Sequence, residues 1–172
     1  MVAIALCFYY LLKPHVPTYD FESIDINAFE MRQGNKLYSD VVVIVKATNP
    51  NENIWLDYLE NEVGVMYSGS QVCKGKIPPF LQPGKNTTMV KAELKGETQF
   101  SSEMESQFLE DQKDLTIPFL VVVRLPIRLL INDVIHLRKF VVNVNCSLVI
   151  DKVQPKERPN ILHKDFTYAI DF

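Results

Sequence analysis

Residues 140–150 read FVVNVNCSLVI, and their alternation decides the fold class. The even positions are all apolar, whereas polar Asn143, Asn145 and Ser147 stand at odd positions. Side chains alternate between the two faces of a β-strand, so this period of two predicts a strand with one buried and one solvated face. Cys146 falls on the buried face, where a thiol is an inert core filler rather than a nucleophile.

The same period recurs along the chain from Pro17 and predicts an all-β domain. Turn residues separate the alternating stretches, as in an antiparallel sandwich. The β-branched run at 41–45 predicts a central strand covered on both faces. Residues 166–170 form either one edge strand or part of a free tail. The other predicted strands are residues 19–31, 38–48, 54–59, 63–67, 71–73, 88–95 and 117–125.

Three further segments interrupt this alternating pattern. Residues 77–85 contain one proline pair, Pro78-Pro79, and one Pro-Gly dipeptide, Pro83-Gly84, and predict a surface crossing loop. Residues 102–105 have capping-box spacing, and Met104, Phe108 and Leu115 form an apolar stripe after it. Together these patterns predict one short helix that ends near residue 114. Pro126 and the pair at 132–133 mark the return between the last two long strands.

Composition excludes several classes of function. The chain has 172 residues, enough for one domain, and a net charge of -3, so nucleic acid is not an expected partner. Its 6 glycines form no phosphate-binding loop. The cysteines and histidines are too scattered for a metal site or a disulfide framework, and no cofactor is expected.

A catalytic site is also not expected. His136 with Asp133 is the best hydrolase pairing, but no nucleophile elbow accompanies it and a solvated return loop explains both residues. The acidic helix could be imagined as a calcium site, yet it lacks the Asp-x-Asp-x-Asp-Gly loop, so a solvated face is expected. Glu103 and Glu105 lie where they stabilise the helix dipole.

Residues 2–12 form an unbroken apolar run that ends at Lys13 and Pro14. As a helix it is about 17 Å long, whereas a membrane span needs about 20 apolar residues. We expect the second half of a transmembrane helix here; the alternative is an apolar first strand or helix packed on the domain. The predicted membrane residues are Val2, Ile4, Leu6, Phe8, Tyr9, Tyr10, Leu11 and Leu12.

Two sequons, at Asn86 and Asn145, are candidate glycosylation sites if the domain is translocated. Asn86 begins a predicted strand, whereas Asn145 lies inside one. Asn145 is therefore the less accessible of the two.

Several short strings together carry a family resemblance. They are ATNPN at 47–51, Ile54, Tyr58, VMYSG at 65–69, GKIPPF at 75–80 and VNC at 144–146. In this order they resemble the group-two late embryogenesis abundant domain, also called the water-stress and hypersensitive-response domain, over residues 17–153. The arrangement is similar to the plant membrane-anchored branch, the harpin-induced-like and disease-resistance-like proteins. The family-motif positions are Asn49, Pro50, Asn51, Tyr67, Gly75, Pro78, Phe80 and Cys146.

The resemblance implies an antiparallel β-sandwich of about seven strands with one helix, similar to fibronectin type III, and no catalytic centre. It also implies a plasma-membrane or cell-wall-junction location, plasmodesmata included, with the domain outside the cytosol. The expected organisation is a partial anchor at 1–13, the sandwich at 14–153 and an extension at 154–172.

We therefore expect a non-enzymatic, membrane-anchored stress or defence protein that binds a protein, a wall component or a lipid. The alternatives are a soluble intracellular desiccation-type protein of the same family and a lipid carrier.

Overall fold

The structure, a computed structural model, describes residues 17–131, 135–154 and 158–171. These residues confirm the predicted all-β class with one short helix. They form ten strands rather than about seven. The elements are β1 (Thr18–Arg32), β2 (Lys36–Asn49), β3 (Ile54–Tyr58), β4 (Glu62–Tyr67), β5 (Ser70–Lys76), β6 (Phe80–Gln82), β7 (Asn86–Gln99), α2 (Ser102–Lys113), β8 (Ile117–Ile131), β9 (Ile135–Ile150) and β10 (Ile161–Asp171).

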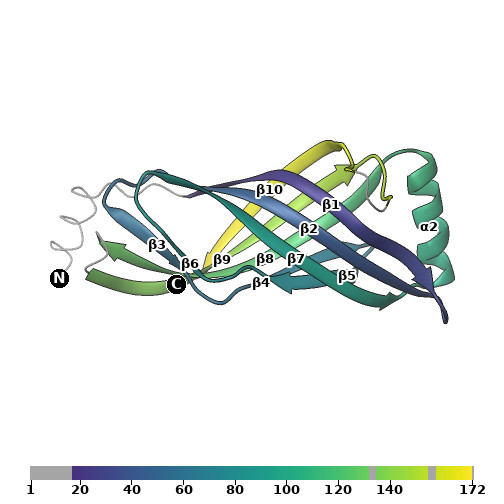
Figure 1. The fold of residues 1–172 in the computed structure, drawn as a ribbon, viewed down its shortest axis with the longest axis horizontal. Helices are drawn as coiled ribbons and strands as arrows, with labels where there is room; N and C mark the ends of the chain where they lie inside the picture. Colours follow the sequence, from purple (N-terminus) through teal and green to yellow (C-terminus); the bar gives the residue numbers. More distant parts are fainter. Residues whose placement is uncertain (1–16, 132–134, 155–157, 172) are drawn as a thin grey trace.

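The strands make one antiparallel sheet that curls on itself. Its order is β1-β2-β7-β5-β4-β8, with β9 and then β10 on the other edge of β8. β3 pairs with the end of β8, and β6 pairs with β3. The two halves of the curled sheet face each other as the layers of a sandwich do. Figure 1 shows an elongated body with α2 at one end and β3 with the β8–β9 hairpin at the other.

Two glycines allow the backbones of β5 and β7 to approach each other closely. A Cβ on Gly75 would lie 2.1 Å from the backbone oxygen of Glu93, and one on Gly96 would lie 2.4 Å from that of Val72. Real Cβ atoms do not approach so closely, so only glycine permits this contact between the two backbones. The family-motif position Gly75 therefore has a structural role.

The inner face of the curled sheet is the hydrophobic core. The even positions from Val142 to Ile150 are buried, as predicted, and Cys146 is among them. In β7 the predicted alternation is also confirmed, with Val90, Ala92 and Leu94 buried between exposed neighbours. The run at 41–45 is central in the sheet, but Val42 and Ile44 on its outer face are only half-buried. The prediction that both of its faces are covered is wrong, because among residues 17–131, 135–154 and 158–171 no second layer covers the outer face of this strand.

The helix is where the capping pattern places it, with two corrections. Its N-cap is Ser101, whose hydroxyl accepts a hydrogen bond from the backbone of Met104, so the cap lies one residue earlier than predicted. Phe108 packs on the core, whereas Leu115 is 59% exposed and is not part of the apolar stripe. Glu103 and Glu105 occupy the first turn, where negative charge is favourable.

The last hairpin is longer than predicted. β8 continues through Pro126 to Ile131, and β9 begins at Ile135 instead of residue 140. Proline is tolerated because β4 pairs with β8 up to Arg124 and β3 pairs with it from Ile127, so the missing N–H falls between the two neighbours. His136 consequently lies in a strand and not in a return loop, while Asp133 is outside the described residues.

The structure corrects the prediction for one further segment and decides between the two alternatives left open for another. Residues 77–85 are not wholly a surface loop, because β6 forms within them and Gln82 is fully buried. Residues 166–170 belong to an edge strand, β10, which pairs with β9. The predicted anchor at 1–13 lies outside the described residues, and within the described part of the chain no helix is long and apolar enough to cross a membrane.

Candidate functional site

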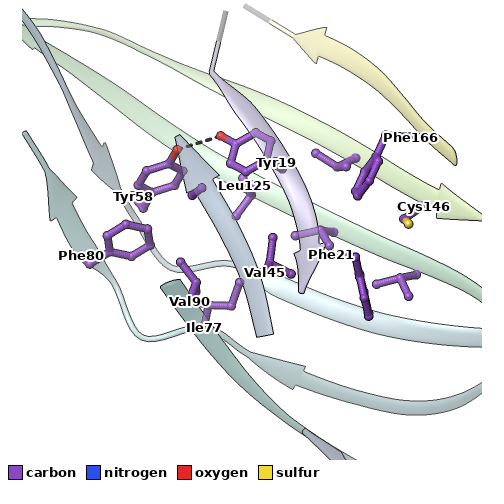
Figure 2. Close-up of a pocket in the computed structure, with 14 residues that line it drawn as sticks. Tyr19, Phe21, Val45, Tyr58, Ile77, Phe80, Val90, Leu125, Cys146 and Phe166 are labelled. Atoms are coloured by element: carbon purple, nitrogen blue, oxygen red, sulfur yellow. Dashed lines mark hydrogen bonds between the residues drawn. The ribbon is translucent and has the colours of Figure 1, made fainter. Parts of the chain in front are cut away.

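An apolar cavity of about 50 Å³ lies inside the curled sheet (Figure 2). Strands from both halves of the sheet contribute to its wall, so residues far apart in the sequence meet there. The lining residues are Tyr19, Phe21, Val45, Ala47, Tyr58, Ile77, Phe80, Val90, Val121, Val123, Leu125, Val144, Cys146 and Phe166. Such a wall offers packing to an apolar group.

Three aromatic side chains meet at one side of the cavity. The Tyr19 and Tyr58 hydroxyls are 2.8 Å apart and share a hydrogen bond, and the Phe80 ring stacks on Tyr58 with centroids 4.4 Å apart (Figure 2). Burial raises the pKa of Tyr58 to about 12. Burial, followed by the neighbouring Tyr58, raises the pKa of Tyr19 well above its ordinary value. Both phenols are therefore neutral at physiological pH.

Because the Tyr58 hydroxyl is buried, we expect the folded protein to lose stability in alkali. Its pKa is about 12 in the folded protein and about 10 when unfolded, so its contribution is complete below about pH 10 and is lost as pH rises toward the folded value. The difference corresponds to about 3 kcal/mol. We expect Tyr58→Phe to lose less stability than the parent between these pH values in denaturant titrations. An identical pH dependence in both proteins would contradict this.

The cavity lies behind a seam between the two edge strands. Sheet pairing within the described residues joins β1 only to β2, and β10 only to β9. Side chains bridge the seam instead: Arg158 pairs with Asp25 at 2.9 Å, and Lys164 pairs with Asp20 at 2.7 Å. Lys164 also donates to the backbone oxygen of Phe21. Exposed ion pairs are weak, so this seam is held less firmly than a hydrogen-bonded ladder.

The described residues do not assemble a reactive centre around the cavity. Burial raises the pKa of Cys146 to about 11, so its thiol stays protonated at neutral pH. Cys73 and Cys146 are both free and buried. Within residues 17–131, 135–154 and 158–171, no three His, Cys, Asp or Glu side chains come together as a metal site requires.

The family-motif asparagines build a buried hydrogen-bond network rather than a binding site. Asn49 is fully buried; its amide donates to the oxygens of Ile54 at 2.8 Å and Pro83 at 3.1 Å. Its own oxygen accepts from the backbone and side chain of Asn51. The turn after β2 is thereby tied to the turn before β7. Pro50 lies between the two asparagines and presets this turn.

Gln82 extends the same arrangement, and the sequence did not single it out. It is fully buried and donates to the backbone oxygens of Ala47 and Asn86. The sequence signal that could have found it is a lone glutamine two residues after an aromatic residue within a proline-rich segment, which is weak.

The other motif residues are distributed over the whole curled sheet, hereafter called the barrel. Tyr67 lies at the α2 end, where its ring packs within 6.0 Å of Phe100, Phe108 and Phe119 and its hydroxyl donates to Asp111. Phe80 stacks on Tyr58 near the opposite end, and Pro78 is exposed in between. The motif positions therefore specify the fold, and the structure brings only Phe80 and Cys146 to the cavity.

The two sequons differ in their surroundings. Asn145 is exposed but lies in the middle of β9, between β8 and β10. Asn86 is half-buried at the start of β7, and its side-chain oxygen accepts from the Thr88 hydroxyl at 2.7 Å.

Comparison of the sequence with known proteins identifies relatives of this chain. Residues 45–148 match the family model described as late embryogenesis abundant protein. The chain is 31% identical over 150 residues to NDR1/HIN1-like protein 6 of Arabidopsis thaliana, an alignment that covers 84% of this chain and 58% of that protein. The chain thus spans little more than half the length of this relative.

A solved structure of a protein from Archaeoglobus fulgidus aligns with 88% of this chain and 95% of its own, at 10% identity and a TM-score of 0.38, too low to support an argument. The family model and the Arabidopsis relative both support a stress- or defence-related protein. Because the family model covers more than half of the residues, the chain belongs to the group-two late embryogenesis abundant family that its sequence resembles.

Proposed function

We propose that this chain is a non-enzymatic stress- or defence-response protein that is anchored in a membrane at its N-terminal end and acts by binding. The family match is the observation that carries the proposal. The apolar run at 2–12, which leads into β1, supports the anchor. The neutral phenols and the protonated thiol at the cavity support binding over catalysis.

The proposal includes an orientation, with the barrel outside the cytosol at the plasma membrane or a cell-wall junction such as a plasmodesma. Protease protection tests the anchor and the orientation together. In sealed vesicles of the secretory pathway that contain the native protein, the barrel should resist added protease until detergent opens the membrane. Digestion without detergent would contradict the orientation, and release of intact protein into the supernatant would contradict the anchor.

Glycosylation at Asn86 is a prediction of this orientation. Asn86 lies next to the turn residue Lys85 at a strand start, whereas Asn145 is paired on both sides within the sheet. We expect glycosidase to lower the mass of the native protein by one glycan and Asn86→Gln to abolish that shift. Asn145→Gln serves as the matched control and should leave the shift intact. An unchanged mass in the parent would count against a translocated barrel.

The cavity supports a second candidate, binding of a small apolar group. A volume of about 50 Å³ is less than the roughly 150 Å³ that accommodates benzene. A lipid carrier therefore needs the seam between β1 and β10 to open. In the proposed function, the chain binds a protein, a cell-wall component or a lipid.

Filling the cavity separates these candidates. Val144→Ile adds one methyl group to the lining, and we expect it to raise the free energy of unfolding by about 0.5–1 kcal/mol. Val149→Ile, on the outer face of the same strand, is the control and should change little. If the cavity is a lipid site, the filled variant will take up less of a fluorescent fatty acid than the parent. Equal uptake by both would overturn the lipid candidate at this cavity.

A further inference from the structure

The end of the barrel opposite α2 is formed by the β8–β9 hairpin and β3 (Figure 1). β1 begins at Thr18, set back from this end, where Tyr19 contacts Tyr58 of β3. The apolar N-terminal run ends at Lys13, and residues 14–17 connect it to β1. A connection of this length spans at most about 18 Å. If the run is a membrane anchor, the half of the barrel that carries the hairpin end, rather than the α2 end, is therefore held near the bilayer.

This end exposes large apolar side chains. Ile135 is 49% exposed and Leu137 is 38% exposed, both at the start of β9. Trp55, the single tryptophan of the chain, is half-buried in β3. It lies opposite Leu130, which is buried and in turn lies opposite His136, so Trp55 and His136 lie on one face of the sheet. Ile135 lies opposite Ile131, which lies opposite Ile54, so this end of the sheet exposes apolar side chains on both of its faces.

Cationic side chains lie beside the apolar ones. Arg128 lies opposite Lys139 in β9 and opposite Asp57 in β3. Residues 124–139 contain four Arg or Lys and a single acidic residue, Asp133, although the whole chain has a net charge of -3. The hairpin thus carries a local positive charge that is opposite in sign to the charge of the molecule.

We propose that this hairpin-end surface, formed by Trp55, Arg128, Ile135, Leu137 and Lys139, docks on a phospholipid bilayer. Ile135 and Leu137 insert among the headgroups, and Arg128 and Lys139 pair with lipid phosphate. Trp55 lies at the interface. The inference rests on the proposed anchor, which supplies the membrane, but it assigns a separate contact to the barrel itself.

The chemistry of the surface favours a bilayer as its occupant. Tryptophan and cationic side chains are enriched at the membrane interface, where an apolar body and a polar end are both satisfied. Two apolar tips beside two cations give shallow insertion together with attraction to lipid phosphate, a group that both leaflets of a membrane carry. An anionic lipid strengthens the same attraction, so it serves as a probe of the two cations. Docking should fix the orientation of the barrel on the membrane and leave the α2 end free for a partner.

Trp55 makes the contact measurable. The full chain is added to phosphatidylcholine vesicles with and without phosphatidylserine, and Trp55 emission is recorded together with flotation of the protein. We expect a shift to shorter wavelength, quenching by brominated phosphatidylcholine, and a stronger effect with phosphatidylserine. In Arg128→Gln/Lys139→Gln the ratio of docked to undocked protein on phosphatidylserine vesicles should fall about 30-fold. The control Lys74→Gln/Lys95→Gln removes the same charge from exposed positions of β5 and β7 and should change little.

The outcomes distinguish docking from the anchor. If the protein floats with the vesicles but Trp55 emission does not change, the docking inference is overturned while the anchor stands. If Trp55 is quenched but an alkaline carbonate wash releases the protein from the vesicles, docking holds and the anchor fails. Equal loss of quenching in the two double variants would also overturn the inference, because the effect would then follow net charge rather than the hairpin-end surface.

Discussion

Replacing Asn49 with aspartate is expected to lower the free energy of unfolding by about 3–5 kcal/mol at neutral pH. The substitution preserves volume but removes the donor that serves the backbone oxygens of Ile54 and Pro83. It also places a carboxylate beside those two oxygens at a fully buried position. The loss should be measured by urea unfolding followed by circular dichroism.

The stability of the Asn49→Asp variant should also depend on pH. Burial next to two carbonyl oxygens raises the pKa of the introduced carboxyl in the folded state, so its proton is retained longer there than in the unfolded chain. The destabilisation should therefore be smaller at about pH 4 than at about pH 7. Asn53→Asp changes an exposed asparagine in the same turn and should stay within about 0.5 kcal/mol of the parent. Similar losses for both variants would show that the buried network is not what stabilises this turn.

Gly75→Ala is expected to cost about 3 kcal/mol or more. Its Cβ would lie 2.1 Å from the backbone oxygen of Glu93 and 2.8 Å from a methyl carbon of Leu94, so β5 and β7 must separate to admit it. Because β5 and β7 pair through only three residues on each strand, the separation would disrupt most of the pairing between these two strands. Thermal and urea unfolding of the purified variant measure the cost.

A second glycine supplies the control for this prediction. Gly34 has a positive φ of 79° but no atom within 4 Å of its ideal Cβ position. Asparagine tolerates that backbone conformation, so Gly34→Asn should cost about 1 kcal/mol or less. If Gly75→Ala is as stable as Gly34→Asn, the close backbone approach does not limit the fold.

The presence of the strands could be predicted from the sequence, because one face of the sheet packs on the core and the other face is exposed to solvent. The alternation in 88–95 and 140–150 follows directly from that asymmetry, and so does the burial of Cys146. The arms of the last hairpin were missed because Pro126 normally ends a strand. Its tolerance here depends on where β3 and β4 meet β8, which is a long-range arrangement.

The candidate site could be predicted only in part. The sequence identified Phe80 and Cys146 through the family resemblance, but it could not bring Tyr19 and Phe166 to the same cavity, because β1 and β10 lie at opposite ends of the chain. The turn chemistry of Asn49 was visible locally, whereas its bond to Pro83 spans 34 residues. The hairpin-end surface depends on the same kind of long-range pairing, between β3, β8 and β9.

Membrane attachment at the N-terminal end is the claim on which the proposed function depends most. The most direct measurement is flotation of membranes that contain the native protein after an alkaline carbonate wash, which strips peripheral proteins but leaves integral ones. We predict that the protein floats with the washed membranes. Recovery in the unfloated supernatant, with an integral marker still floating, would contradict the account.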